Sequence, residues 1–283
     1  MSSRKRTLKF FTIPALLYIL LGTIYPIYYL IELSLYKVTT VRGYMTFTYV
    51  GLENFIRVFN DRLFWNSLMV TVFFTIASVL VELILGITLV FILPKKNFLV
   101  TLFILTMMIS PVGVALIWRF LLYPNIGVFD SFAQNFLGFH IPWLGDPFWA
   151  KMTIVIVDVW HWTGFVFLII YAGYSSLPIT VFEAAQVDGA SSFQRFVRIA
   201  LPLLKPTIAV ALFFRTVDVL QAFPELWQLT FGGPAYSTTI LNILVYIATF
   251  DMCDWSYAAV VSLFLMLISL IIAIFYSLYI RRV

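Results

Sequence analysis

The sequence predicts an all-α integral membrane protein with six transmembrane helices. Apolar residues make up 62% of the 283 residues and charged residues only 11%, and the mean hydropathy is +1.00. Soluble domains average about 45–50% apolar and about 25% charged residues, so a water-soluble fold could not hide this much apolar surface. A disordered chain is excluded because it needs low hydrophobicity and high charge. The single cysteine, Cys253, excludes an internal disulfide framework and a multi-cysteine metal site.

Six apolar stretches are long enough to cross a bilayer, since about 20 helical residues span its hydrocarbon core. We expect helices because each helix satisfies its own backbone hydrogen bonds in lipid. The alternating segments typical of a membrane barrel are not found in the sequence. The predicted spans are Phe11–Leu35, Phe64–Leu93, Phe98–Leu122, Met152–Tyr174, Thr207–Leu229 and Tyr257–Ile280.

The first stretch is expected to be a retained helix rather than a cleaved signal peptide. It follows basic residues, as a signal core does, but its apolar run is about twice the usual length and no small-residue cleavage site follows. The other five stretches form one transmembrane domain, residues 64–280, preceded by an N-terminal part, residues 1–63.

The distribution of lysine and arginine predicts that both ends of the chain are cytoplasmic. With the ends inside, the cytoplasmic segments carry eleven basic residues and the external segments carry four. Basic residues favour the cytoplasmic side of a bilayer. The net charge of +5 is therefore a signal of topology rather than of nucleic-acid binding.

The segment between the fourth and fifth spans has about 30 residues and lies on the predicted cytoplasmic side. A long ordered loop in a compact protein is usually functional. Pro178 favours a helix start, and Gly189 can end that helix in a left-handed conformation. Ser191 or Ser192 can cap a second helix, which Pro202 and Pro206 are expected to end before the fifth span. The segment therefore predicts two short helices at the membrane surface.

This loop contains Glu183-Ala184-Ala185 and, two residues further on, Asp188-Gly189-Ala190. With these residues it resembles the EAA loop of ABC-importer permeases. The family pattern is Glu-Ala-Ala, two residues, Asp-Gly-Ala, and then Phe, Ile, Leu-Pro and Pro at fixed offsets, and the sequence follows it without departure. A match of this many positions at fixed spacing is a specific signal. The matching residues are Glu183, Ala184, Ala185, Asp188, Gly189, Ala190, Phe196, Ile199, Leu201, Pro202 and Pro206.

Further segments are similar to the carbohydrate, or maltose-type, branch of that family, and the resemblance covers nearly the whole chain. Gly51–Phe55 is similar to the external lead-in of these permeases, and Leu229–Pro234 to the segment after their fifth span. The Gly-Gly-Pro in the latter indicates the first of two unlike permeases. The resemblance implies a membrane subunit of a binding-protein-dependent importer for a sugar, oligosaccharide or polyol, in the plasma (inner) membrane of a prokaryote.

The resemblance also implies partners. The chain has no Gly-x-x-x-x-Gly-Lys-Ser/Thr phosphate loop, so we expect no cofactor on it, and ATP and magnesium on two partner ATPase subunits. A second permease and an extracytoplasmic solute-binding protein would complete the complex. The residues implied to couple to the ATPase are Glu183, Ala184, Ala185, Asp188, Gly189, Ala190, Phe196 and Pro202.

Ionisable residues inside spans are costly and are functional hypotheses by default. Asp158 and His161 lie three apart on one helix face, and Arg215 and Asp218 have the spacing of an intrahelical pair. For these groups both structural packing and cavity lining stay open, whereas Glu82 is expected to form interhelical hydrogen bonds. The candidate substrate-path residues are Gln221, Asp158, His161, Asp218 and Glu225.

Three alternatives are weighed against this interpretation. Within the family, the substrate could be a sugar phosphate of the glycerol-phosphate type. A secondary transporter would work without ATPases, but it should show an internal repeat and discontinuous helices, and the sequence indicates neither. A membrane-embedded enzyme would need a clustered catalytic set, whereas the ionisable residues here are scattered.

Overall fold

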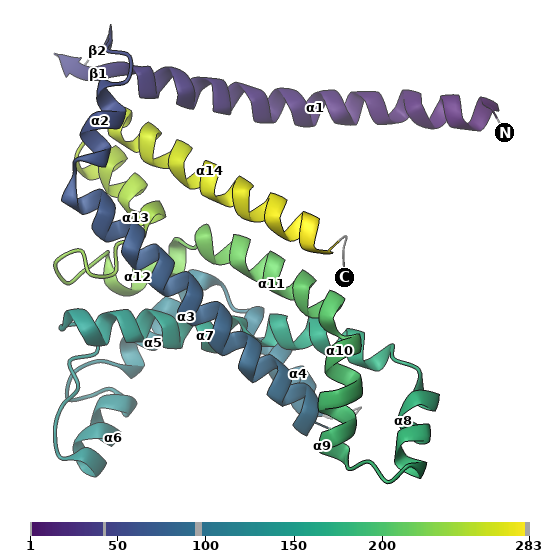
Figure 1. Ribbon diagram of the computed structural model, residues 1–283. Helices are drawn as coiled ribbons and strands as arrows, with labels where there is room; N and C mark the ends of the chain where they lie inside the picture. The colour runs from purple at the N-terminus through teal and green to yellow at the C-terminus, as the bar shows by residue number, and fades with distance from the viewer. Residues whose placement is uncertain (1, 42–43, 94–97, 281–283) are drawn as a thin grey trace. The chain divides into compact units, whose positions relative to one another are not determined.

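The computed structural model describes residues 2–41, 44–93 and 98–280, and most of this part of the chain is helical (Figure 1). The chain divides into two compact units, which are described separately. Unit 1 contains residues 1–64 and 244–266, and unit 2 contains residues 65–243 and 267–283. Four of the eleven basic residues counted as cytoplasmic, Lys95, Lys96, Arg281 and Arg282, lie outside the described residues.

Unit 1 joins the first helix to a β-hairpin, which the prediction of an all-α fold missed. The two strands pair antiparallel, with Tyr36 opposite Tyr49. Valine, threonine and aromatic residues make up most of both strands, and these residue types favour a pleated sheet over a helix. The elements are α1 (Ser2–Leu35), β1 (Tyr36–Val41), β2 (Tyr44–Tyr49), α2 (Glu53–Phe59), η2 (Ile247–Asp251) and the first part of α14 (Trp255–Ile280).

Two polar side chains fix the hairpin to its neighbours in unit 1. The hydroxyl of Ser256, at the start of α14, donates to the Tyr36 carbonyl at 2.7 Å and accepts from the Val38 N–H at 2.9 Å. The Asn54 amide on α2 donates to the carbonyls of Ser34 and Tyr36. Backbone groups where helix and strand meet are thus satisfied by side chains, as burial requires.

Unit 2 is organised around α7, which buries 13 of its 29 residues. Asp146 caps this helix by accepting from the N–H groups of Phe148 and Trp149. Helices α4, α5, α11 and α12 all pack against it. The elements are α3 (Arg62–Ile92), α4 (Phe98–Met107), α5 (Pro111–Leu121), α6 (Val128–Leu137), α7 (Pro147–Ser175), α8 (Ile179–Val187), α9 (Ser192–Arg195), η1 (Phe196–Ala200), α10 (Leu201–Leu203), α11 (Lys205–Leu220), α12 (Pro224–Thr230) and α13 (Leu241–Tyr246).

Among the described residues, four helices are long and apolar enough to cross a membrane, and two bent helix pairs raise the number to six if each pair is one span. The four are in α1, α3, α7 and α14. They coincide with four of the six predicted spans.

The other two predicted spans are broken, and the expectation of no discontinuous helices is wrong. Helix α4 ends at Met107 and α5 begins at Pro111, with a bend of 100° between them. The predicted fifth span is interrupted where α11 ends at Leu220 and α12 begins at Pro224. Each break precedes a proline, whose ring disfavours the helical conformation of the residue before it. The second bent pair is a different one, Ser192–Leu203 with Lys205–Leu220, bent by 66°.

Helices α4 and α7 approach each other closely at Gly164. A Cβ atom at this position would lie 2.1 Å from the carbonyl oxygen of Phe103. Only glycine leaves room for the backbone of α4 here, because the obstructing atom is main chain rather than a movable side-chain end.

We expect Gly164→Ala to destabilise the protein by about 1–3 kcal/mol, because overpacking must push α4 and α7 apart. The measurement is the thermal unfolding of the purified protein in detergent. Gly22→Ala in α1 is the matched control, since no atom lies within 4 Å of the added Cβ. Equal unfolding temperatures for the two variants would contradict the close approach.

Candidate functional site

The loop between α7 and α11 forms the predicted pair of short helices. Helix α8 follows Pro178 and ends at Asp188. Gly189 then adopts a φ of +78°, and the Ala190 N–H donates to the Ala185 carbonyl at 2.9 Å. This left-handed glycine and its backward hydrogen bond close α8 as expected. Figure 1 shows α8 and α9 side by side beyond this turn.

The second helix of the loop begins with a capping box. The Ser191 hydroxyl accepts from the Gln194 N–H at 3.2 Å, and the Gln194 side chain accepts from the Ser191 N–H at 2.9 Å. Of the two serines that the sequence offered as a cap, Ser191 is therefore the one used.

The second helix ends at Leu203, between Pro202 and Pro206, the two prolines predicted to end it. Helix α9 continues through the π-turn η1 and through α10 to Leu203, and the chain bends by 66° between Leu203 and Lys205. In the π-turn the Leu201 N–H bonds to the Phe196 carbonyl. Pro202 then stands in the first turn of α10, where a missing N–H is tolerated.

The second half of the loop is packed against α7, whereas α8 in its first half is exposed. Phe196 and Leu204 are buried in an apolar cluster that includes Phe167 and Ile170 of α7. Helix α8 has no buried residue, and Val187 on it is 88% exposed. Of the predicted coupling residues, Phe196 is thus buried, Ala185 and Ala190 are partly buried, and the following are exposed: Glu183, Ala184, Asp188, Gly189 and Pro202.

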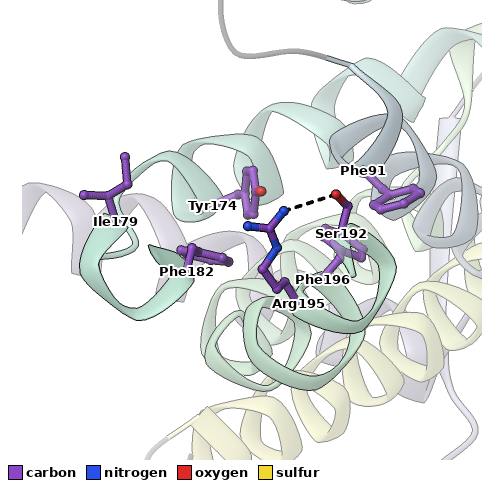
Figure 2. A pocket seen from close by; sticks show the side chains of 7 residues that line it. All are labelled: Phe91, Tyr174, Ile179, Phe182, Ser192, Arg195 and Phe196. Carbon is purple, nitrogen blue, oxygen red and sulfur yellow. Dashed lines mark hydrogen bonds between the residues drawn. The ribbon is translucent and has the colours of Figure 1, made fainter. Parts of the chain in front are cut away.

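A cavity of about 250 Å³ separates the two helices of the loop, and Figure 2 shows its lining. Arg195 reaches across it, donating to the Gln186 side chain on α8 at 2.5 Å and to the Ser192 hydroxyl at 3.2 Å. This arginine therefore ties α8 to α9. The remaining lining residues are apolar or aromatic: Phe91, Tyr174, Ile179, Phe182 and Phe196.

A second polar site lies within the helices of unit 2, centred on Arg215. Its guanidinium donates to Glu82 through Nε at 2.6 Å and through Nη2 at 2.9 Å. Nη2 also donates to Asp158 at 2.6 Å, and Nη1 donates to Asp218 at 2.5 Å. The predicted pairing of Arg215 with Asp218 and the interhelical role of Glu82 are confirmed. The spacing of residues in the sequence did not reveal that Arg215 connects α3, α7 and α11.

His161 lies one turn from Asp158 on α7 but contacts a different partner. Its Nδ1 is 2.7 Å from Glu225 Oε2 at the start of α12, and its Nε2 is 3.2 Å from the Ile109 carbonyl in the break between α4 and α5. One buried histidine therefore contacts both interrupted spans, at the break between α4 and α5 and at the start of α12.

Four of the five predicted substrate-path residues line one cavity of about 120 Å³. They are Asp158, Asp218, Gln221 and Glu225, and Trp162 and Arg215 also line it. His161 is outside this lining and is connected to it through Glu225. Gln221 is exposed, and its backbone carbonyl accepts a hydrogen bond from the Asn242 amide at 2.9 Å.

The sequence could have indicated Arg215 as the centre of the polar site. It is a lone cation in an apolar span, and such a group needs anionic partners on the helices that surround it. What the sequence does not reveal is which carboxylates they are. Glu82 is 133 residues away along the chain.

Asp130 lies on α6, in the connection between α5 and α7, and is nearly fully buried. Its carboxylate accepts from the Asn125 N–H at 2.7 Å, and His140 Nδ1 lies 2.8 Å from the same oxygen. The hydrogen bond from the Asn125 backbone, with a contribution from His140, holds the pKa of Asp130 below its usual value. The contribution of this carboxylate to stability is therefore present above its ordinary pKa of 3.8 and is lost only as the pH falls below it.

Apolar helices around a polar cavity, with an unburied surface helix at one end, define a membrane-embedded permease. The chain belongs to the family of inner membrane components of binding-protein-dependent transport systems, whose model matches residues 83–283.

Relatives and solved structures agree with this family. The chain is 35% identical to the trehalose/maltose transport system permease protein MalF of Thermococcus litoralis, over 93% of this chain and 90% of the relative. It is 34% identical to the lactose transport system permease protein LacF of Rhizobium radiobacter, over 89% and 86%. Its fold matches a chain of a bacterial ABC transporter for alginate import with a TM-score of 0.83, at 23% identity over 99% of this chain and 97% of that one.

Replacing Arg215 with glutamine should destabilise the protein by about 3–5 kcal/mol, because the buried Glu82 and Asp158 would lose their counter-charge. Thermal unfolding in detergent measures the effect. Arg198→Gln, which removes an exposed arginine from the loop, is the control and should change stability little. The double variant Glu82→Gln/Arg215→Gln should recover part of the loss, and no recovery would contradict the pairing.

Proposed function

We propose that this chain is a pore-forming subunit of an ATP-driven importer for a sugar, oligosaccharide or polyol. Family membership carries the proposal, and the relatives support the substrate class, since they are permeases named for trehalose and maltose, for lactose and for sulfoquinovosyl glycerol. The chain spans 90% and 86% of the length of the first two of these relatives.

The proposed complex contains a second, unlike permease, two ATPase subunits and an extracytoplasmic solute-binding protein. A solved relative of the same fold was crystallised with an alginate pentasaccharide-bound periplasmic protein, which supports the last of these partners. ATP and magnesium would be bound by the ATPase subunits. This chain would act as a pore rather than as an enzyme.

In the proposed topology both termini are cytoplasmic, and α4 with α5 and α11 with α12 each count as one of six spans of a prokaryotic plasma membrane. The four continuous apolar helices would supply the other four. Residues 64–280 would form the transmembrane domain and residues 1–63 its N-terminal extension.

The loop between α7 and α11 would be the contact with the ATPase. Helix α8 and its C-cap present Glu183, Ala184, Val187 and Asp188 to the outside, and α8 buries no residue. In η1, by contrast, Phe196 and Ala200 are buried. A partner that holds α8 would therefore move a segment already fixed to the transmembrane helices. Such coupling requires a partner that binds the two states of the permease differently.

We expect Gly189→Pro to lower ATP-dependent uptake by about tenfold or more, a loss of about 1.4 kcal/mol or more in coupling. The positive φ of Gly189 is closed to proline, so the turn that orients α8 cannot form. The measurement is uptake of radiolabelled maltose or trehalose into proteoliposomes holding the assembled complex, with immunoblotting to check membrane insertion.

Gly189→Asn is the matched control, because asparagine tolerates the left-handed conformation and open space surrounds the position. It should retain most of the uptake. Normal uptake by Gly189→Pro would refute the coupling role of the loop.

A further inference from the structure

The cavity between α7, α11 and α12 carries more acidic than basic groups. Arg215 is surrounded by three carboxyl groups, those of Glu82, Asp158 and Asp218. Even if one of these held a proton, two carboxylates would oppose one guanidinium. The side chain of Asp218 is 51% exposed and lines the cavity, so part of the negative charge faces the space that a solute would occupy.

The one arginine in the lining is already engaged. A guanidinium has five N–H donors, and four hydrogen bonds from Arg215 go to the three carboxyl groups. The Trp162 ring covers its face at 5.2 Å. Arg215 itself is 1% exposed. It therefore offers an anionic solute neither an open face nor a free pair of N–H groups.

The His161–Glu225 pair adds no positive charge. Both ring nitrogens of His161 face acceptors, the Glu225 carboxylate and the Ile109 carbonyl. Both can donate only if the ring is doubly protonated, and an imidazolium beside a carboxylate is neutral overall. The surplus negative charge around Arg215 is thus not cancelled by this pair.

The cavity also contains an acceptor without a donor. Glu225 is 4% exposed, and its Oε1 has no hydrogen-bond partner within the part of the chain that the structure describes. A buried carboxylate oxygen requires a donor. Because Glu225 lines the cavity, a hydroxyl group of a solute there can supply that donor.

We propose that this cavity admits uncharged polyhydroxylated solutes and excludes anions, with Asp218 as a specificity-determining residue. The assignment rests on the proposed function for the identity of the solute as a carbohydrate. Carboxylates accept hydrogen bonds from hydroxyl groups but repel phosphate, sulfonate and carboxylate groups. The uncharged sugars named by some relatives would then pass, and a sugar phosphate would be disfavoured.

The test measures the electrostatic potential of the cavity through the reaction rates of charged thiol reagents. The native thiol is removed by Cys253→Ser, and Gln221→Cys places a new one in the lining. The full chain with its partner subunits is placed in nanodiscs, which leave both membrane faces open. Rates of modification are measured with cationic trimethylammonium-ethyl and anionic sulfonatoethyl methanethiosulfonate, each divided by its rate with a free thiol.

The corrected ratio of cationic to anionic rates should be about tenfold or more, as expected for a reagent concentrated by a charged cleft. Asp218→Asn in the same background should lower the ratio by roughly threefold, because it removes the exposed charge. Glu53→Gln removes the same charge from an exposed position on α2 that does not line the cavity, and it should leave the ratio unchanged. Size-exclusion chromatography checks that each variant assembles.

A ratio near one, or a faster anionic reaction, would overturn the proposal. So would a thiol at position 221 that reacts with neither reagent, since the cavity would then be closed to solutes. An unchanged ratio in Asp218→Asn would remove that residue as the determinant. The measurement requires no ATP hydrolysis or transport, so failure of the proposed importer function would appear separately, as absent uptake.

Discussion

The arrangement of the helices in unit 2 depends on the charge of Arg215. A guanidinium within apolar helices is tolerated only if its charge and its N–H donors are satisfied by protein. Glu82 on α3 and Asp158 on α7 supply partners from two helices, and Asp218 supplies one from its own helix. These contacts fix α11 against α3 and α7 at a defined depth and rotation. A buried ion group is weak evidence for added stability, but it does select one arrangement of helices over others.

The two interrupted spans and the cavity are connected by shared polar contacts. Ending α4 at Met107 leaves carbonyl groups without intrahelical partners, and that of Ile109 contacts His161. The same histidine contacts Glu225, where the second interrupted helix restarts. Helices α5 and α12, the segments beyond the two breaks, pack against each other, and Arg119 on α5 donates to the Gln228 carbonyl on α12 at 3.2 Å. Irregular backbone at membrane depth is thus satisfied by protein groups, as lipid requires.

Helix α11 connects the loop to the cavity. Its N-terminal end follows directly on η1 and α10, which are packed into the apolar cluster around Phe167. Its C-terminal part carries Arg215 and Asp218, and Gln221 follows its last residue. A continuous helix transmits displacement along its axis with little loss, so a force on the loop would reach the cavity through this element.

The sequence by itself determined the membrane class, four of the six spans, and the loop with its glycine turn and serine cap. These are local properties, since composition, apolar length and capping chemistry act within a few turns of helix. The pairing of Arg215 with Asp218 could also be predicted, because the two residues are three apart on one helix. The hairpin after α1 was missed because each strand is only six residues long and β1 has no regular apolar–polar alternation.

Only the tertiary structure decided where two spans break, and that Glu82, Asp158 and Asp218 converge on one arginine. A proline in an apolar run can kink a helix, end it or be tolerated, as Pro111, Pro224 and Pro202 respectively illustrate. Packing against neighbouring helices selects among these outcomes, and it also brings together carboxylates that lie 57 and 133 residues from Arg215 along the chain. Charge surplus in the cavity is a property of that convergence, which no local pattern in the sequence contains.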